Sequence, residues 1–270
     1  MRAKLILFFE IHKKKVFLFA YLRKKLYLCA AFTAHVQHVC NRKKGIMTIL
    51  SIETSTSVCS AALSQDGRLL KECIHPEGSN HAQLLPRYVE ELLALAREQG
   101  LKIDAIGLSE GPGSYTGLRI GASTAKGLCY GLSVPLIAVP TLEVWCEERI
   151  ANSQALKAKD GALFPMIDAR RMEVYTLVNG ETRAVVVEGE ESLGAQGEAY
   201  YFGDGATKCQ EVLKSPDWHF VPGIVPQAQY VCALAERGNG RKIEGEQIAY
   251  YEPFYLKEFI AAQSHVKGLK

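Results

Sequence analysis

The stretch Ser109–Gly131, SEGPGSYTGLRIGASTAKGLCYG, decides how the rest of this chain is organised. The apolar residues 103–108 precede it and predict a short buried strand, because they show no helical period. Gly111-Pro112-Gly113 then interrupts regular structure, and Ser114 is a suitable N-cap for a helix that begins near Tyr115. We therefore predict a strand, a glycine-rich turn and a helix, in that order.

The predicted helix carries three internal glycines, each of which costs roughly 1 kcal/mol relative to Ala. Gly117, Gly121 and Ala125 share one face, where another backbone can approach closely. That face fits close packing on the chain's own sheet, a phosphate cradle or a contact with another subunit. Free backbone N–H groups at a helix start also suit an anion. The candidate anion-binding residues are Gly111, Gly113, Ser114 and Arg119.

Composition separates the first residues of the chain from the rest. The 270 residues carry a net charge of +3, with 48% hydrophobic and 23% charged residues, as in ordinary globular domains. Residues 1–46 hold eleven Lys and Arg but a single acid, Glu10, which amounts to +10, so the remaining residues carry −7. That mild acidity argues against a broad nucleic-acid footprint on the folded part. The eight cysteines form no CxxC pair, which favours a reducing compartment and predicts a cytoplasmic protein.

The basic segment 1–46 alternates short apolar runs with clusters of Lys and Arg. No run reaches the roughly 18–20 uncharged residues of a membrane span, and the interruptions make a poor signal peptide. Met47 opens the first predicted strand. We therefore expect residues 1–46 to be an extension that is not part of the fold.

From Met47 onward the pattern predicts an α/β protein. Residues 47–150 show three strands, a helix, a strand and the glycine-rich helix, followed by a further strand and helix, and they form a predicted first lobe. A polar stretch near residues 152–161 marks a boundary. Residues 151–270 repeat the theme in reduced form and form a predicted second lobe.

The helix that ends near Gly100 has two apolar stripes, more than one sheet face requires. Leu85, Val89, Leu92 and Ala96 form the first, and Leu84, Tyr88 and Leu95 form the second. The helix therefore lies either in deep core or between its own sheet and a partner.

Two lobes that each open with three antiparallel strands resemble the ribonuclease-H-like lobes of the actin, Hsp70 and sugar-kinase superfamily. The motifs at 49–56, 109–131, 140–142, 167–175 and 255–256 sharpen this likeness, because together they resemble the TsaB (YeaZ) family. Members of this family are bacterial subunits of tRNA threonylcarbamoyladenosine biosynthesis. The resemblance covers Met47 to about Lys257 and implies two ribonuclease-H-like lobes, the second one reduced.

The resemblance implies a non-catalytic scaffold and activator that pairs with a TsaD-type catalytic paralogue. It further implies a homodimer when the chain is alone, a TsaE-type ATPase that joins through the complex, tRNA contacted only through the complex, and no membrane. The expected interface residues lie on the two first-lobe helices: Leu84, Tyr88, Leu92, Leu95, Gly117, Leu118, Gly121 and Ala125.

TsaD-type enzymes hold a metal through a His-x3-His pair, and this comparison predicts no metal here. His81 starts the corresponding segment, but no second His follows four residues later, and the chain has no His-x3-His anywhere. We expect no catalytic residues and no cofactor, with room only for weak or interfacial ATP or ADP. The alternative is an active ATP-dependent transferase or kinase, for which Glu53, Asp168 and Asp204 are the acids to examine. Of these, we expect Glu53 to be a capping or turn acceptor and Asp168 to stabilise the hairpin turn, whereas for Asp204 a turn role fits equally well.

Overall fold

The computed structural model describes residues 46–76, 78, 80–152, 161–194 and 197–257. Described residues from Ile46 onward belong to one compact unit. The expectation for the segment 1–46 concerns residues outside this description, apart from Ile46.

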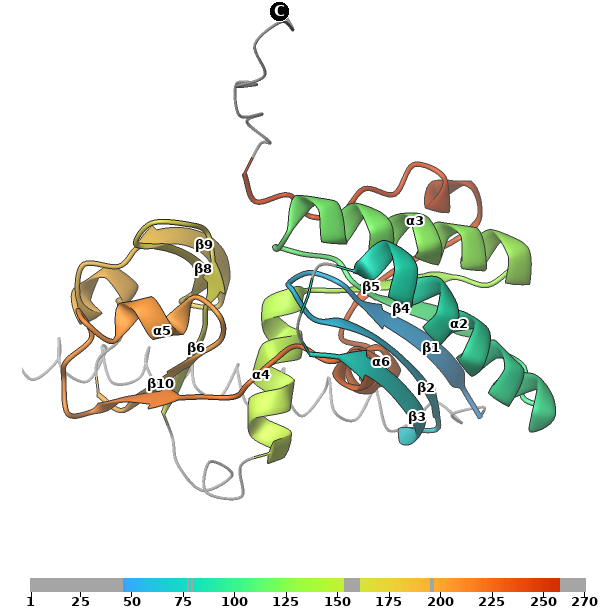
Figure 1. The fold of residues 1–270 in the computed structure, drawn as a ribbon, viewed down its shortest axis with the longest axis horizontal. Helices are drawn as coiled ribbons and strands as arrows, with labels where there is room; N and C mark the ends of the chain where they lie inside the picture. The colour runs from blue at the N-terminus through green and yellow to red at the C-terminus, as the bar shows by residue number, and fades with distance from the viewer. Residues whose placement is uncertain (1–45, 77, 79, 153–160, 195–196, 258–270) are drawn as a thin grey trace, which may run out of the picture. The chain divides into compact units, whose positions relative to one another are not determined.

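The first lobe is built on a six-stranded sheet in the order β12-β5-β4-β1-β2-β3 (Figure 1). β1, β2 and β3 pair antiparallel, whereas β4 lies parallel to β1 and β5 parallel to β4. β12 adds an antiparallel edge beside β5. The strands are β1 (Thr48–Glu53), β2 (Cys59–Gln65), β3 (Arg68–His75), β4 (Ala105–Ser109), β5 (Leu136–Val139) and β12 (Arg241–Ile243).

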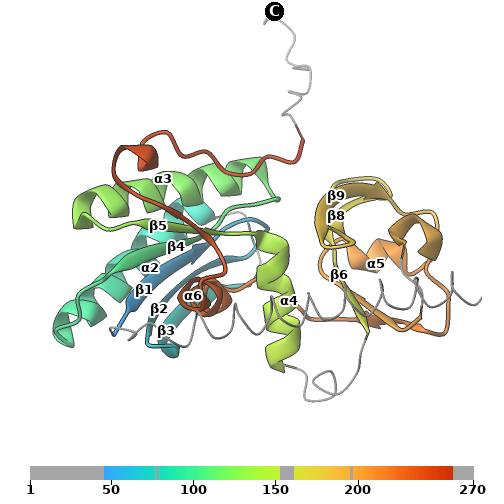
Figure 2. The same ribbon diagram turned by 180° about the vertical axis from the view of Figure 1, so that it is seen from behind.

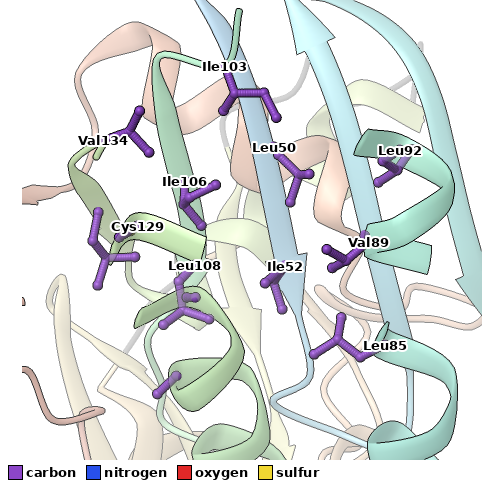
Figure 3. Close-up of a cluster of buried hydrophobic side chains, with 14 of the residues drawn as sticks. Leu50, Ile52, Leu85, Val89, Leu92, Ile103, Ile106, Leu108, Cys129 and Val134 are labelled. Atoms are coloured by element: carbon purple, nitrogen blue, oxygen red, sulfur yellow. The ribbon is translucent and has the colours of Figure 1, made fainter. Parts of the chain in front are cut away.

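Helices cover both faces of this sheet, and β1 is therefore buried along its whole length. Helices α2 (His81–Glu98) and α3 (Tyr115–Leu132) pack on one face, and α6 (Ala228–Arg237) packs on the other. Successive side chains of a strand point to opposite faces. Leu50 accordingly belongs to a first buried cluster, under α2 and α3, whereas Ile49 belongs to a second cluster, which α6 covers. Figure 3 shows the first cluster, with Leu85 and Leu92 of α2 directed at the central strands.

The second lobe repeats this strand order. Its strands are β6 (Ala162–Pro165), β7 (Ile167–Asp168), β8 (Glu173–Val178), β9 (Glu181–Val186), β10 (Ala199–Phe202) and β11 (Trp218–Val221). β10 lies parallel to both β6 and β11, and β7-β8-β9 is an antiparallel meander. Only Met166 separates β6 from β7, so the lobe follows the order β9-β8-β7/β6-β10-β11, which corresponds to β3-β2-β1-β4-β5.

The connections in the second lobe are short. Where α2 and α3 each have 18 residues, the equivalent helices η2 (Glu190–Leu193) and α5 (Ala206–Cys209) have four each. The predicted fold class is confirmed: the protein is α/β, with two ribonuclease-H-like lobes, of which the second is reduced.

The observed packing does not follow the predicted division of the chain into lobes at residue 150. Helix α6 and strand β12 pack on the first sheet, although both fall in the range 151–270 assigned to the second lobe. Side chains of strands β2 and β3 form hydrogen bonds with the first turn of α6. Ser60 Oγ accepts a hydrogen bond from the Ala228 N–H at 2.9 Å, and Glu72 Oε1 accepts one from the Gln229 N–H at 3.0 Å. These bonds satisfy helix amides that lack partners inside the helix.

Helix α4 (Thr141–Asn152) packs on both lobes, and its Val144 belongs to the cluster that α6 covers. Its residues Leu142 and Trp145 pack with Ile167 and Phe202 of the second lobe. Figure 2 shows α4 next to α6, and the two helices contact each other. Helical periodicity predicts that a segment has an apolar face, but it does not indicate which sheet covers that face.

Candidate functional site

The glycine-rich turn after β4 is tied to neighbouring segments through its backbone. The Gly111 N–H donates to Thr141 Oγ1, and the Thr141 N–H donates to the Gly111 carbonyl, both at 3.0 Å. The Ser114 N–H donates to the Ser55 carbonyl at 2.6 Å. Ser114 Oγ accepts from the Gly117 N–H at 3.3 Å, which confirms the predicted N-cap. The amides of Gly111 and Ser114 are therefore already used within the chain and are not available to an anion, whereas an anion-binding role for Gly113 and Arg119 stays a prediction.

The small face of α3 packs on the loop that follows β1. A Cβ added at Gly113 would overlap Ser55, and one added at Gly117 or Gly121 would overlap Thr54. The Thr54 hydroxyl also donates to the Gly117 carbonyl at 2.9 Å. Of the three interpretations of this face, close packing within the chain accounts for these glycines.

Five of the eight expected interface residues lie in the chain's own core, so their assignment to an interface is wrong. They are Leu92, Gly117, Leu118, Gly121 and Ala125. A side chain packed in the folded lobe cannot contact another subunit at the same time. The spacing indicated a tightly packed helix face, but it did not indicate whether that face points inward or outward.

Leu84, Tyr88 and Leu95 are half-buried on the flank of α2 that carries Glu91, which contacts Lys71 of β3, and they remain candidates for an interface. Helices α2 and α3 contact each other. Ile120 and Leu128 of α3 are also half-buried against the core. These five side chains together with Gly127 are called the α2–α3 surface below.

Gly127 is the member of this surface that sequence reasoning missed. A Cβ added there would meet nothing within 4 Å, and the same holds at Gly131. Both glycines are exposed and lie one helical turn apart. The available signal was the unexplained cost of a third glycine inside one helix.

Glu53 ends β1 and is fully buried. Its Oε1 accepts from the Ser55 N–H at 2.5 Å, which is the turn role considered for it. Burial raises the pKa of Glu53, and hydrogen bonds from Ser109 and Ser55 oppose that shift only in part. Burial thus opposes ionisation of this carboxyl group, and the ionised form is the one that binds Mg²⁺.

The corresponding end of the second lobe uses its acids in turns as well. Asp204 Oδ1 accepts from the Asp168 N–H at 3.0 Å, and Lys208 forms an ion pair with Asp168. A Cβ at Gly203 would overlap the Met166 carbonyl oxygen, so this turn is also closely packed. Burial is the main cause of the raised pKa of Asp204.

His81 lies at the start of α2 and is buried. Its Nε2 lies 2.9 Å from the Thr56 carbonyl oxygen, and since a carbonyl only accepts, the ring N–H donates. Among the residues that the structure describes, no group of three or more His, Cys, Asp and Glu side chains could hold a metal ion. The same residues include no helix long and apolar enough to cross a membrane.

Comparisons with known proteins place the chain in a family. Residues 68–230 match the family model TsaD, tRNA N6-adenosine threonylcarbamoyltransferase. TsaB of Escherichia coli, named a tRNA threonylcarbamoyladenosine biosynthesis protein, is 33% identical over 242 residues, which cover 80% of this chain and 96% of that protein. TsaB of Bacillus subtilis is 37% identical over 130 residues, or 48% of this chain and 54% of that protein.

Solved structures agree with this assignment. YeaZ of Pseudomonas aeruginosa is 28% identical, with a TM-score of 0.58, and the match covers 78% of this chain and 100% of that one. This structural match and the E. coli relative both extend over nearly the whole of the related protein, whereas the B. subtilis match spans about half of it. The chain therefore belongs to the TsaB (YeaZ) family.

Proposed function

We propose that this chain is a non-catalytic subunit of tRNA threonylcarbamoyladenosine biosynthesis and that it pairs with a TsaD-type catalytic paralogue through the α2–α3 surface. Its place in the TsaB family supports a part in that biosynthesis, which the relatives carry in their names. The match of residues 68–230 to the TsaD model supports a partner with related lobes.

Gly127 is the observation that carries the pairing proposal. Gly117 and Gly121 are required by the contact with Thr54, whereas nothing within the described chain requires a glycine at 127. Glycine in a helix interior costs roughly 1 kcal/mol relative to Ala. Close approach of a partner backbone gives that cost a reason, and Gly131, one helical turn further on, leaves the same side of the helix open.

Related lobes can meet through equivalent helices across an approximate twofold axis, as in an isologous contact. The same surface then supports a homodimer when the partner is absent. A TsaE-type ATPase would join the assembled pair.

The non-catalytic assignment is supported by the acids at the two strand ends. Glu53 and Asp204 have raised pKa values and accept hydrogen bonds from turn amides. Neither arrangement favours the ATP-dependent kinase or transferase alternative, which needs an ionised carboxylate beside Mg²⁺.

Light-scattering mass tests the pairing, with the full chain measured alone and mixed with the TsaD-type protein of the same cell. We expect a dimer alone and a heteromer in the mixture, and Gly127→Arg should abolish both without unfolding the lobe. Gly121→Arg cannot serve, because a side chain there would overlap Thr54.

The matched control is Gln210→Arg, which adds the same charge at an exposed position of the second lobe. It should pair like the wild type. Normal pairing by a folded Gly127→Arg chain would refute the proposed surface, and a wild type that never binds the partner would refute the scaffold role.

A further inference from the structure

A groove of about 490 Å³ lies between α3 and the extended segment 251–257. In Figures 1 and 2 this segment, coloured red, runs along α3. The volume falls within the range of about 300–1,000 Å³ that ligand clefts occupy. The groove is separate from Gly127 and the apolar side chains of the α2–α3 surface, none of which line it.

Basic side chains outnumber acids along this groove. Arg119, Lys126 and Lys257 line it, against the single acid Glu252. This excess of positive charge is local, since residues 47–270 as a whole carry a net charge of −7. A polyanion approaching this part of the protein would therefore be drawn to the groove.

Contacts within the chain position each cation. The Arg119 Cζ lies 5.0 Å from the centroid of the Tyr115 ring, within the range of a cation–π contact. Lys126 Nζ donates to the Tyr251 carbonyl at 3.2 Å, and this bond ties the segment to α3. Lys257 forms an ion pair with Glu173 at the start of β8.

The groove also offers an aromatic pair. The rings of Tyr115 and Tyr255 lie with centroids 5.0 Å apart and planes tilted by 41°. Burial raises the pKa of Tyr255, so its phenol keeps its proton at neutral pH and can donate a hydrogen bond. Aromatic rings next to basic side chains are the combination that binds single-stranded nucleic acid, through base stacking and phosphate contacts.

We infer that this groove binds RNA directly, with Arg119 and Lys126 on the phosphates and a base against the Tyr115–Tyr255 pair. The inference rests on the proposed function and extends it, because it gives the non-catalytic subunit a contact of its own with the tRNA substrate. A narrow groove of this kind is compatible with an otherwise acidic surface.

The test is a fluorescence-anisotropy titration of a labelled tRNA anticodon stem-loop at several salt concentrations. It uses the full chain, both alone and assembled with the TsaD-type partner. For single-stranded nucleic acid, the slope of log K against log salt falls by about 0.7 for each phosphate that the protein no longer neutralises. We expect Arg119→Gln to lower the slope by about 0.7, and Arg119→Gln with Lys126→Gln by about 1.4.

Two further variants separate charge from stacking. Arg119→Lys keeps the charge and should retain the wild-type slope. Tyr115→Leu should weaken binding by at least about fivefold without changing the slope, because a stacked base contributes about 1–3 kcal/mol. The charge-matched control is Lys102→Gln with Lys214→Gln, two exposed positions outside the groove.

Equal slopes for the groove and control double variants would overturn the inference. Loss of ATP binding with unchanged RNA binding in Arg119→Gln would overturn it too, since the groove would then take a mononucleotide. Light-scattering mass of the same samples keeps the two proposals apart. Groove variants that pair normally and bind RNA normally refute only the groove, whereas a wild type that fails to pair refutes the proposed function.

Discussion

The two lobes share one strand order but differ in what covers the strands. In the first lobe, two helices of 18 residues each join the strands, and they carry the residues of the α2–α3 surface. In the second lobe, four-residue helices occupy the equivalent connections. The strand order therefore survives when the connecting helices shrink.

The strand-end acids differ in the same comparison. Each accepts a hydrogen bond from the N–H two residues on, Glu53 from Ser55 and Asp168 from Arg170. Glu53 is fully buried, however, whereas Asp168 in the equivalent position is exposed and also pairs with Lys208. Both glycine turns pack on the end of the first strand of their lobe, Gly113 on Ser55 and Gly205 on Ile167 and Asp168. The shared topology thus preserves the close packing of the turn, but not the chemistry of the acid beside it.

The largest loss of stability is expected from substitutions in the cores beneath the connecting helices. Leu85 of α2 and Leu193 of η2 are both buried. Leu85→Ala should lower the free energy of unfolding by about 2–5 kcal/mol, because the long helix cannot collapse into the cavity. Leu193→Ala should cost less, since a single short turn can adjust. Urea denaturation of the full chain measures both, and equal losses would show that the second lobe is packed as rigidly as the first.

A smaller loss is expected where α3 meets the loop after β1. Gly117→Ala places a methyl group against the Thr54 carbonyl and should cost about 1–3 kcal/mol through overpacking. Thermal unfolding, compared with Gly131→Ala as the control at an open position, measures it. A stable Gly117→Ala protein would show that α3 can move away from Thr54, contrary to the packing described above.

Glu53 gives the stability of the first lobe a pH dependence. Its folded-state pKa is raised, so the folded chain binds more protons than the unfolded chain between about pH 4.5 and that value. Stability contributed by this group therefore falls as the pH rises through that window and stays constant above it. Glu53→Gln should remove this slope and add on the order of 1 kcal/mol at pH 7. Denaturation curves over a pH series test this, and an unchanged slope would contradict it.

The smallest effect concerns the glycine that packing leaves unexplained. Gly127→Ala should stabilise the isolated chain by about 0.5–1 kcal/mol, because the added methyl group meets open space. It should at the same time weaken pairing, which light-scattering mass records. A gain in stability together with full pairing would remove the argument for close approach at this position.

Much of the fold could be predicted from local signals. Apolar runs and turn residues predicted the three antiparallel strands after Met47, and Ser114 predicted the start of α3. The motif order further indicated the family. The packing of α6 on the first lobe and of α4 on both lobes could not be predicted, because periodicity identifies an apolar face without its partner. The candidate site was predicted less well for the same reason. Gly117 and Gly121 indicated a closely packed helix face, but not that Thr54 of the same chain, rather than a partner, covers it.

Amide hydrogen exchange of the full chain, with and without the TsaD-type protein, tests the central claim most directly. We predict that the partner slows exchange in peptides from α2 and α3, and leaves peptides from β8, β9 and α5 unchanged. The first lobe would then be the pairing lobe. Protection confined to the second lobe, with α2 and α3 exchanging as in the isolated chain, would contradict this assignment.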